Sequence, residues 1–68
     1  MRIQLNGEEA EIASAATLAE AISATGADPD GRGVAAAIEG EVVARDQWRE
    51  RRLREGESVE VVHAVQGG

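Results

Sequence analysis

The residues that could do chemistry in this sequence lie at its C-terminus, where the chain reads Gln66-Gly67-Gly68. Glycine lacks a Cβ, so two in a row give a thin, flexible peptide that can enter a narrow cleft. At roughly 3.3–3.6 Å per extended residue, the segment from Val65 to Gly68 could carry the terminal carboxylate about 13 Å beyond the last packed side chain. A frayed end is the alternative interpretation, since the last residues of most domains are poorly ordered.

The reactive group of such a tail would be the free carboxylate of Gly68, which is ionised at neutral pH and is a poor electrophile. Acyl chemistry on this carboxylate requires its conversion to a mixed anhydride, for example with AMP. A partner enzyme would have to enclose the tail for that step and exclude water. An extended tail without side chains at Gly67 and Gly68 fits this requirement.

Other catalytic groups have little support in the sequence. His63 is the only histidine, and in the final apolar run it is expected to be a half-exposed strand residue rather than a base or a ligand. The three serines share that one histidine, so a catalytic triad is not indicated. We expect a protein that is not itself an enzyme.

One segment carries part of a calcium-binding pattern. Asp28, Asp30, Arg32, Gly33 and Glu39 fall at positions 1, 3, 5, 6 and 12 of an EF-hand loop. Arg32 would place a cation where the loop requires an oxygen ligand, so an acidic turn is the better interpretation. The chain also has no cysteine for a thiolate site. We expect no metal site.

Composition narrows the class of protein further. A chain of 68 residues with 43% hydrophobic residues predicts a single domain over residues 1–68. The net charge of −6 argues against binding to nucleic acid, because phosphate contacts require a basic face. No apolar run approaches the roughly 20 residues of a membrane helix, and the start of the chain does not resemble a signal peptide. We expect a cytoplasmic protein that binds neither membranes nor nucleic acid.

The elements that must position the tail begin with a hairpin and a helix. Residues 2–5 and 8–13 alternate polar and apolar around Asn6-Gly7, a strong signal for a type I′ turn. Thr17 and Glu20 have the spacing of a capping box, so we expect a helix of about two turns from Thr17. Its apolar face and the glycine suited to its end are Leu18, Ala21, Ile22, Thr25 and Gly26.

The second half of the chain predicts more strands. Residues 34–38 and 41–44 flank Glu39-Gly40 and favour a second hairpin, although the alanines of the first segment also suit a helix. Asp46 is expected to cap a short helical turn that runs through Arg49, with a longer helix to Arg54 as the alternative. The chain then turns at residues 55–57 into a final strand.

The only aromatic residue, Trp48, has two possible roles. Trp is enriched at interface hot spots, so it could anchor a partner. We favour the other interpretation, in which it covers one end of a core that lacks other large side chains. The four arginines at positions 49, 51, 52 and 54 are interleaved with Glu50 and Glu55 and indicate a solvated surface.

A hairpin, a crossing helix and further strands are the order of a β-grasp fold. We therefore expect an α+β protein with a mixed sheet of four to five strands curled round one helix. The first and last strands would lie side by side at the centre of the sheet.

A small β-grasp chain that ends in Gly-Gly resembles the ThiS-type sulfur carriers, which are ubiquitin-like proteins. The resemblance rests on residues 38–48, IEGEVVARDQW, and on residues 56–62, GESVEVV, which lead to AVQGG at the C-terminus. The chain departs from the family at Ala44, where proline is usual, and this affects the rigidity of a turn rather than the chemistry.

The resemblance implies that a ThiF-type adenylyltransferase uses ATP and magnesium to adenylate Gly68. Sulfur that comes from cysteine through a desulfurase would displace AMP and leave a thiocarboxylate, which donates sulfur to the thiazole synthase ThiG in thiamine biosynthesis. By analogy with similar tails, partners would bind the exposed apolar face of the last strand and the tail residues Ala64, Val65, Gln66 and Gly67. The carrier itself would bind no cofactor.

Two other interpretations remain open at this point. One is a MoaD-type small subunit of molybdopterin synthase, although such chains are usually longer and richer in aromatic residues. The other is a ubiquitin-like modifier or a non-covalent interaction domain.

Overall fold

The computed structural model describes residues 1–64 of the chain. The elements, in chain order, are β1 (Arg2–Leu5), β2 (Glu8–Glu11), α1 (Leu18–Ala24), β3 (Val34–Ile38), β4 (Glu41–Val43), the 3₁₀ turn η1 (Arg45–Gln47) and β5 (Ser58–His63). Gly67 and Gly68, on which the expected chemistry falls, lie outside the described residues.

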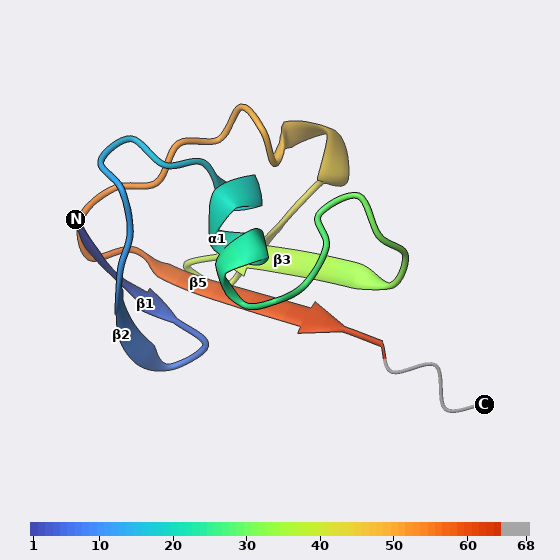
Figure 1. Ribbon diagram of the computed structural model, residues 1–68, viewed down its shortest axis with the longest axis horizontal. Coiled ribbons are helices and arrows are strands. Elements are labelled where there is room, and N and C mark those ends of the chain that lie inside the picture. Colours follow the sequence, from blue (N-terminus) through green and yellow to red (C-terminus); the bar gives the residue numbers. More distant parts are fainter. Residues whose placement is uncertain (65–68) are drawn as a thin grey trace.

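The five strands form one mixed sheet in the order β2-β1-β5-β3-β4. β5 is the central strand and pairs in parallel with β1 and antiparallel with β3. Helix α1 covers one face of this sheet (Figure 1). The predicted β-grasp fold is confirmed, including the central pairing of the first and last strands. No helix among residues 1–64 has the length and apolar character that crossing a membrane requires.

Asn6 and Gly7 form the turn of the first hairpin, with φ angles of 52° and 83°, as a type I′ turn requires. β2 ends at Glu11, two residues before the predicted end. Asn6 also bonds to the central strand: its N–H donates to Val59 O at 2.9 Å, and its Oδ1 accepts from Val61 N at 2.8 Å. The side chain therefore extends the contact between the first hairpin and β5 beyond the end of β1.

The first turn of α1 has a partner for each of its free N–H groups, which otherwise lack an acceptor within a helix. Glu20 N donates to Thr17 Oγ1 at 3.3 Å, so the predicted cap residue is confirmed. Leu18 N donates to Arg51 O and Ala19 N to Trp48 O, both at 2.9 Å, and Ala21 N donates to Thr17 O at 3.2 Å. These hydrogen bonds hold the segment that follows η1 against the first turn of α1.

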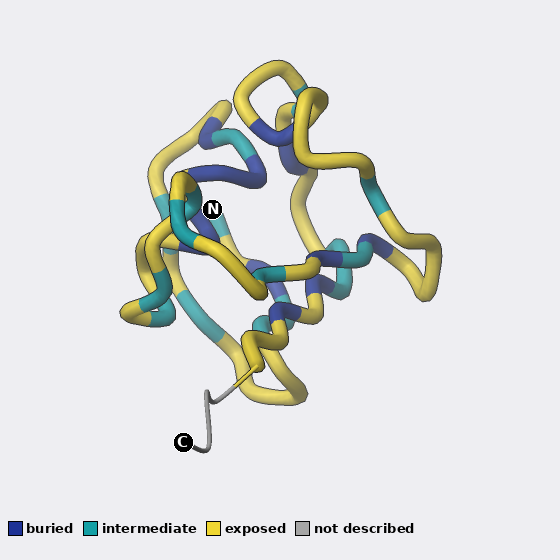
Figure 2. The backbone as a smooth tube through the Cα atoms, turned by 90° about the vertical axis from the view of Figure 1, so that its right-hand side faces the viewer, coloured by how far each residue is buried: buried dark blue, intermediate teal, exposed yellow. Residues whose placement is uncertain are grey.

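The core lies between α1 and the covered face of the sheet. Buried residues recur at every second position along parts of β3 and β5 (Figure 2). Trp48 is 3% exposed, and its Nε1 donates to Val43 O at 2.9 Å. The structure therefore supports the role of Trp48 as a core cover rather than an exposed anchor. The main cluster of buried residues is Ile3, Leu18, Ala19, Ala21, Ile22, Ala36, Ile38, Trp48, Leu53, Val59 and Val61.

The prediction that Asp46 caps the short helical turn is wrong. η1 begins at Arg45 and its N-cap is Ala44, whose extended backbone makes no side-chain cap. Asp46 lies inside the turn, and the longer helix to Arg54 does not form. The turn begins two residues earlier than predicted, and the chain beyond it places the carbonyls of Trp48 and Arg51 against the N–H groups of α1.

Glu57 lies directly before β5 and holds the segment that leads into it. Its carboxylate accepts hydrogen bonds from Nη1 and Nη2 of Arg51, at 3.4 and 2.7 Å, and from Arg54 N at 2.8 Å. Burial raises the pKa of the Glu57 carboxyl, but these hydrogen bonds and the two guanidinium charges outweigh burial. The net effect is a pKa below the ordinary value of 4.5.

We expect Asn6→Ala to lower the free energy of unfolding by about 1–3 kcal/mol, because Val61 N loses its acceptor and Ala tolerates a positive φ poorly. Urea denaturation followed by circular dichroism measures the change. Asn6→Asp is the matched control, because it keeps both the oxygen acceptor and the tolerance of a positive φ. An equal loss in Asn6→Asp, or no loss in Asn6→Ala, would contradict the proposed role of this side chain.

We expect the ionised Glu57 carboxylate to stabilise the fold at pH values above 4.5, because its pKa is lower in the folded than in the unfolded chain. This contribution should disappear as the pH falls from 4.5 through the folded-state pKa. Glu57→Gln, which cannot ionise, provides the comparison. The stability difference between the native protein and Glu57→Gln should narrow over that range, and a difference that stays constant would contradict the assignment.

Candidate functional site

The candidate site lies at the C-terminal end of β5, where Ala64 follows the strand. Ala64 N donates to Gly33 O at 2.8 Å, directly beyond the pair that Val34 forms with His63. Hydrogen bonding to the chain that enters β3 therefore continues through Ala64, which is itself exposed. Of the predicted tail residues, Ala64 is placed by the structure, and residues 65–68 lie outside the described part.

Gly33 lies in close contact with Ala64. Its φ of +72° lies in the left-handed region, which favours glycine. A Cβ at this position would lie 3.4 Å from the Cβ of Ala64, so the two backbones meet at van der Waals distance. Sequence patterns alone do not identify Gly33 as part of the site. Its place in the Asp-Pro-Asp-Gly-Arg-Gly loop indicated a turn, but only the pairing of β3 with β5 shows which residue it touches.

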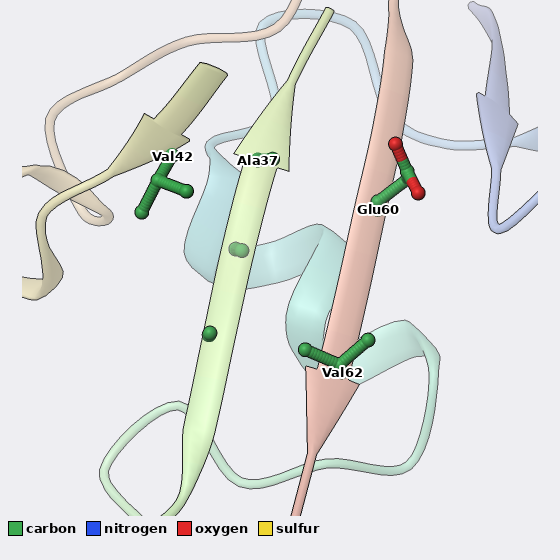
Figure 3. Close-up of a pocket in the computed structure, with 6 residues that line it drawn as sticks. Ala37, Val42, Glu60 and Val62 are labelled. Carbon is green, nitrogen blue, oxygen red and sulfur yellow. The ribbon is translucent and has the colours of Figure 1, made fainter. Parts of the chain in front are cut away.

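The face of the sheet opposite α1 carries an apolar hollow next to this exit. Val42 is 81% exposed and Val62 is 65% exposed, whereas their neighbours Val59 and Val61 on β5 point into the core. The hollow has a volume of about 160 Å³. In Figure 3, Val42 from β4 and Val62 from β5 lie on either side of β3, with the helix behind the strands. Its lining residues are Ala35, Ala36, Ala37, Val42, Glu60 and Val62.

The register of the strands explains why these side chains gather. Ala37 lies opposite Val42 on one side and opposite Glu60 on the other, and Ala35 lies opposite Val62. Side chains opposite one another in a sheet share a face. Two alanines on the middle strand of the group leave a depression between the larger side chains of its neighbours. The predicted apolar face of the last strand is therefore present, with additional apolar residues from β3 and β4.

Charged groups cover the other half of the same face, over β1 and β2. Arg2 lies 3.8 Å from Glu9 and 3.5 Å from Glu11, with all three side chains exposed. Glu60 stands at the boundary, as a wall of the hollow. The open face is thus divided into a charged half and an apolar half, and the apolar half includes Val62, two residues before Ala64.

The other candidates from the sequence do not join this site. His63 alternates with Val59 and Val61, so it shares the face that α1 covers, yet it is exposed near the end of β5. Within residues 1–64, no group of three or more His, Asp or Glu side chains is placed to hold a metal ion. In the acidic loop, Asp28 Oδ1 accepts from Asp30 N at 2.9 Å, and Asp30 is paired with Arg49. These contacts support the interpretation of an acidic turn.

Comparisons with known proteins agree with this architecture. The crystal structure of a thiamine biosynthesis protein (ThiS) from Geobacter metallireducens is similar with a TM-score of 0.78 and 24% identity, covering all of both chains. An NMR solution structure of a thiamine biosynthesis protein from the same organism has a TM-score of 0.76 and 24% identity, covering 100% of this chain and 88% of that one. At this identity the likeness establishes the fold. No curated protein matches the chain.

A match to a family model identifies the family, which the structural likeness alone does not. The model described as the ThiS family matches residues 3–68, which is nearly the whole chain and includes the C-terminal glycines. The resemblance inferred from residues 38–48 and 56–68 is therefore confirmed, and the chain belongs to the ThiS family.

Proposed function

We propose that this protein is a sulfur carrier of thiamine biosynthesis whose reactive group is the C-terminal carboxylate of Gly68. The observation that carries this proposal is the ThiS family match, because it extends through the tail to residue 68. Membership in this family supports the sulfur-carrier role. The position of β5 supports it further, since the central strand leads straight to the tail.

The chemistry proceeds in successive steps on a partner enzyme. A carboxylate oxygen of Gly68 attacks the α-phosphorus of ATP, pyrophosphate leaves, and an acyl adenylate forms. The persulfide that a desulfurase forms from cysteine then attacks the acyl carbon and AMP leaves, which gives an acyl disulfide. A thiol reductant cleaves the S–S bond of this disulfide and releases the thiocarboxylate. ATP and magnesium belong to the partner, a ThiF-type adenylyltransferase, and the carrier supplies only the carboxylate. The absence of a side chain at Gly67 and Gly68 lets the partner's walls approach the backbone closely.

The apolar half of the open face is the docking surface in this proposal. Val42 and Val62 are exposed, and their burial against a partner would release apolar surface from water. Ala64 directly follows this strand, so a partner bound at the hollow also lies close to the start of the tail. The net charge of −6 favours partners whose docking sites are basic. We propose the thiazole synthase ThiG as the acceptor of the sulfur.

We expect deletion of Gly68, or Gly67→Trp, to abolish thiocarboxylate formation while the fold remains intact. The deletion leaves the carboxylate one residue short, and the indole blocks a channel that fits glycine. The assay incubates the carrier with the adenylyltransferase, ATP, magnesium, a sulfur source and a thiol reductant, and intact mass then reports replacement of oxygen by sulfur. His63→Ala is the control and should react like the native protein.

The same assay separates the rival functions. An isopeptide conjugate in place of the sulfur product would indicate a modifier, and a native protein that remains unchanged would indicate a binding domain. Transfer of sulfur to a molybdopterin synthase large subunit and not to thiazole synthase would indicate a MoaD-type subunit. Normal thiocarboxylate yield in either tail variant would overturn the role of Gly68.

We expect Val62→Glu to raise the KM of the carrier for the adenylyltransferase by about tenfold or more, because burial of a Val side chain contributes about 1.5–3 kcal/mol. The step after docking should keep its kcat, since the tail is unchanged. Gln47→Glu adds the same charge at an exposed position away from the sheet face and is the matched control. Equal effects of the two variants on KM would show that charge, and not the hollow, determines binding.

A further inference from the structure

We propose that Arg45 is a positioning residue for the tail, because it fixes the loop that holds Ala64. This inference rests on the proposed function, in which the tail after Ala64 is presented to a partner enzyme. Arg45 Nη1 donates to Pro29 O at 2.8 Å, and Arg45 Nη2 donates to Gly31 O at 2.7 Å. One guanidinium group therefore holds two carbonyls of the loop between α1 and β3.

Arg45 packs against Trp48, a side chain that is itself held in the core. Its guanidinium lies over the ring of Trp48, with 4.8 Å between the guanidinium carbon and the ring centroid. Trp48 is buried and is fastened in turn through Nε1 to Val43 O at 2.9 Å. Stacking on an aromatic ring orients the planar group so that both donors of its fork face the loop. Arg45 thus links the buried Trp48 to the loop that contains Pro29 and Gly31.

The loop between α1 and β3 connects the carbonyls that Arg45 binds to the residue that contacts Ala64. Gly31 N donates to Asp28 O at 2.8 Å, which closes a tight turn inside the held segment. Only Arg32 separates Gly31 from Gly33, whose carbonyl accepts the hydrogen bond from Ala64 N at 2.8 Å. The contacts therefore run from Trp48 through Arg45 and the loop to the last described residue before the tail.

This arrangement assigns separate tasks to two parts of the molecule. The apolar hollow on the opposite face binds a partner, whereas Arg45 acts on where the chain leaves the sheet. Loss of Arg45 should consequently leave docking intact and disturb delivery of the carboxylate. A purely structural role would instead lower the stability of the whole fold and affect docking and delivery together.

The first experiment measures amide hydrogen exchange by NMR in the carrier alone, without nucleotide or partner. In Arg45→Ala we expect exchange at Ala64 N to become about tenfold faster, because the hydrogen bonds that hold its acceptor loop are lost. Exchange at Val61 N in the central strand should not change. Arg45→Lys keeps the charge without the rigid fork and should restore part of the protection. Arg54→Ala removes the same charge from an exposed position and is the control.

A second variant tests the same contact from the other side. Gly33→Ala places a Cβ against Ala64 at a φ of +72° and should also speed exchange at Ala64 N. The kinetic counterpart is adenylation of Gly68, for which we expect Arg45→Ala and Gly33→Ala to lower kcat severalfold with little change in KM.

Unchanged exchange at Ala64 N in Arg45→Ala would overturn the inference, as would equal acceleration at Val61 N or an equal effect of Arg54→Ala. Faster exchange at Ala64 N with an unaltered kcat would overturn the positioning role. A native carrier that is not adenylated at all would instead sink the proposed function, and the exchange measurement, which needs no partner, distinguishes that failure from the others.

Discussion

The central position of β5 is the constraint on which the rest of the structure depends. This strand forms parallel pairs with β1 and antiparallel pairs with β3, so both of its edges are hydrogen-bonded. Its side chains are divided as well: Val59 and Val61 enter the core, and Val62 faces outward. Because the strand is held on both edges and on one face, the point at which the chain leaves the sheet is fixed relative to the whole domain. A carrier that presents its own terminus requires this fixed point.

A core almost without aromatic residues imposes a second constraint. Small aliphatic side chains supply limited buried area in a domain of this size, so the polar contacts around the core gain importance. Trp48 closes one end of the core, while the backbone around it accepts hydrogen bonds from the first turn of α1. The segment from residue 44 to residue 57 has little regular structure, yet it links the helix, the core and the entrance to β5. Its irregular course is therefore a consequence of the contacts it must satisfy.

Local signals were sufficient to predict much of the fold. Asn6-Gly7 determined the hairpin, Thr17 the start of the helix and Gly26, with φ of +91°, the residue after its end. The prediction failed at Asp46, which has the chemistry of a cap, because η1 begins at Arg45. The hydrogen bonds from α1 to Trp48 and Arg51 beyond the turn join segments that are distant in sequence, and local patterns do not reveal them. The reactive tail stays a prediction, because residues 65–68 lie outside the described part of the chain. The roles of Gly33 and Arg45 could not be predicted, since each depends on a partner more than 10 residues away in sequence.

The hollow and the start of the tail are connected by one strand, because β5 contributes Val62 to the hollow and ends one residue before Ala64. Val62 lies on β5, and Ala64 lies two residues further along the chain, directly after the strand ends at His63. In the proposed function, a partner that buries Val62 is therefore close to Ala64. The alanines of β3 deepen the surface exactly where this contact begins, because larger side chains at positions 35 and 37 would fill it. In the proposed function, docking on the hollow therefore selects the orientation in which the terminal carboxylate is presented. The contacts of Gly33 with Ala64 tie the end of β5 to the folded domain.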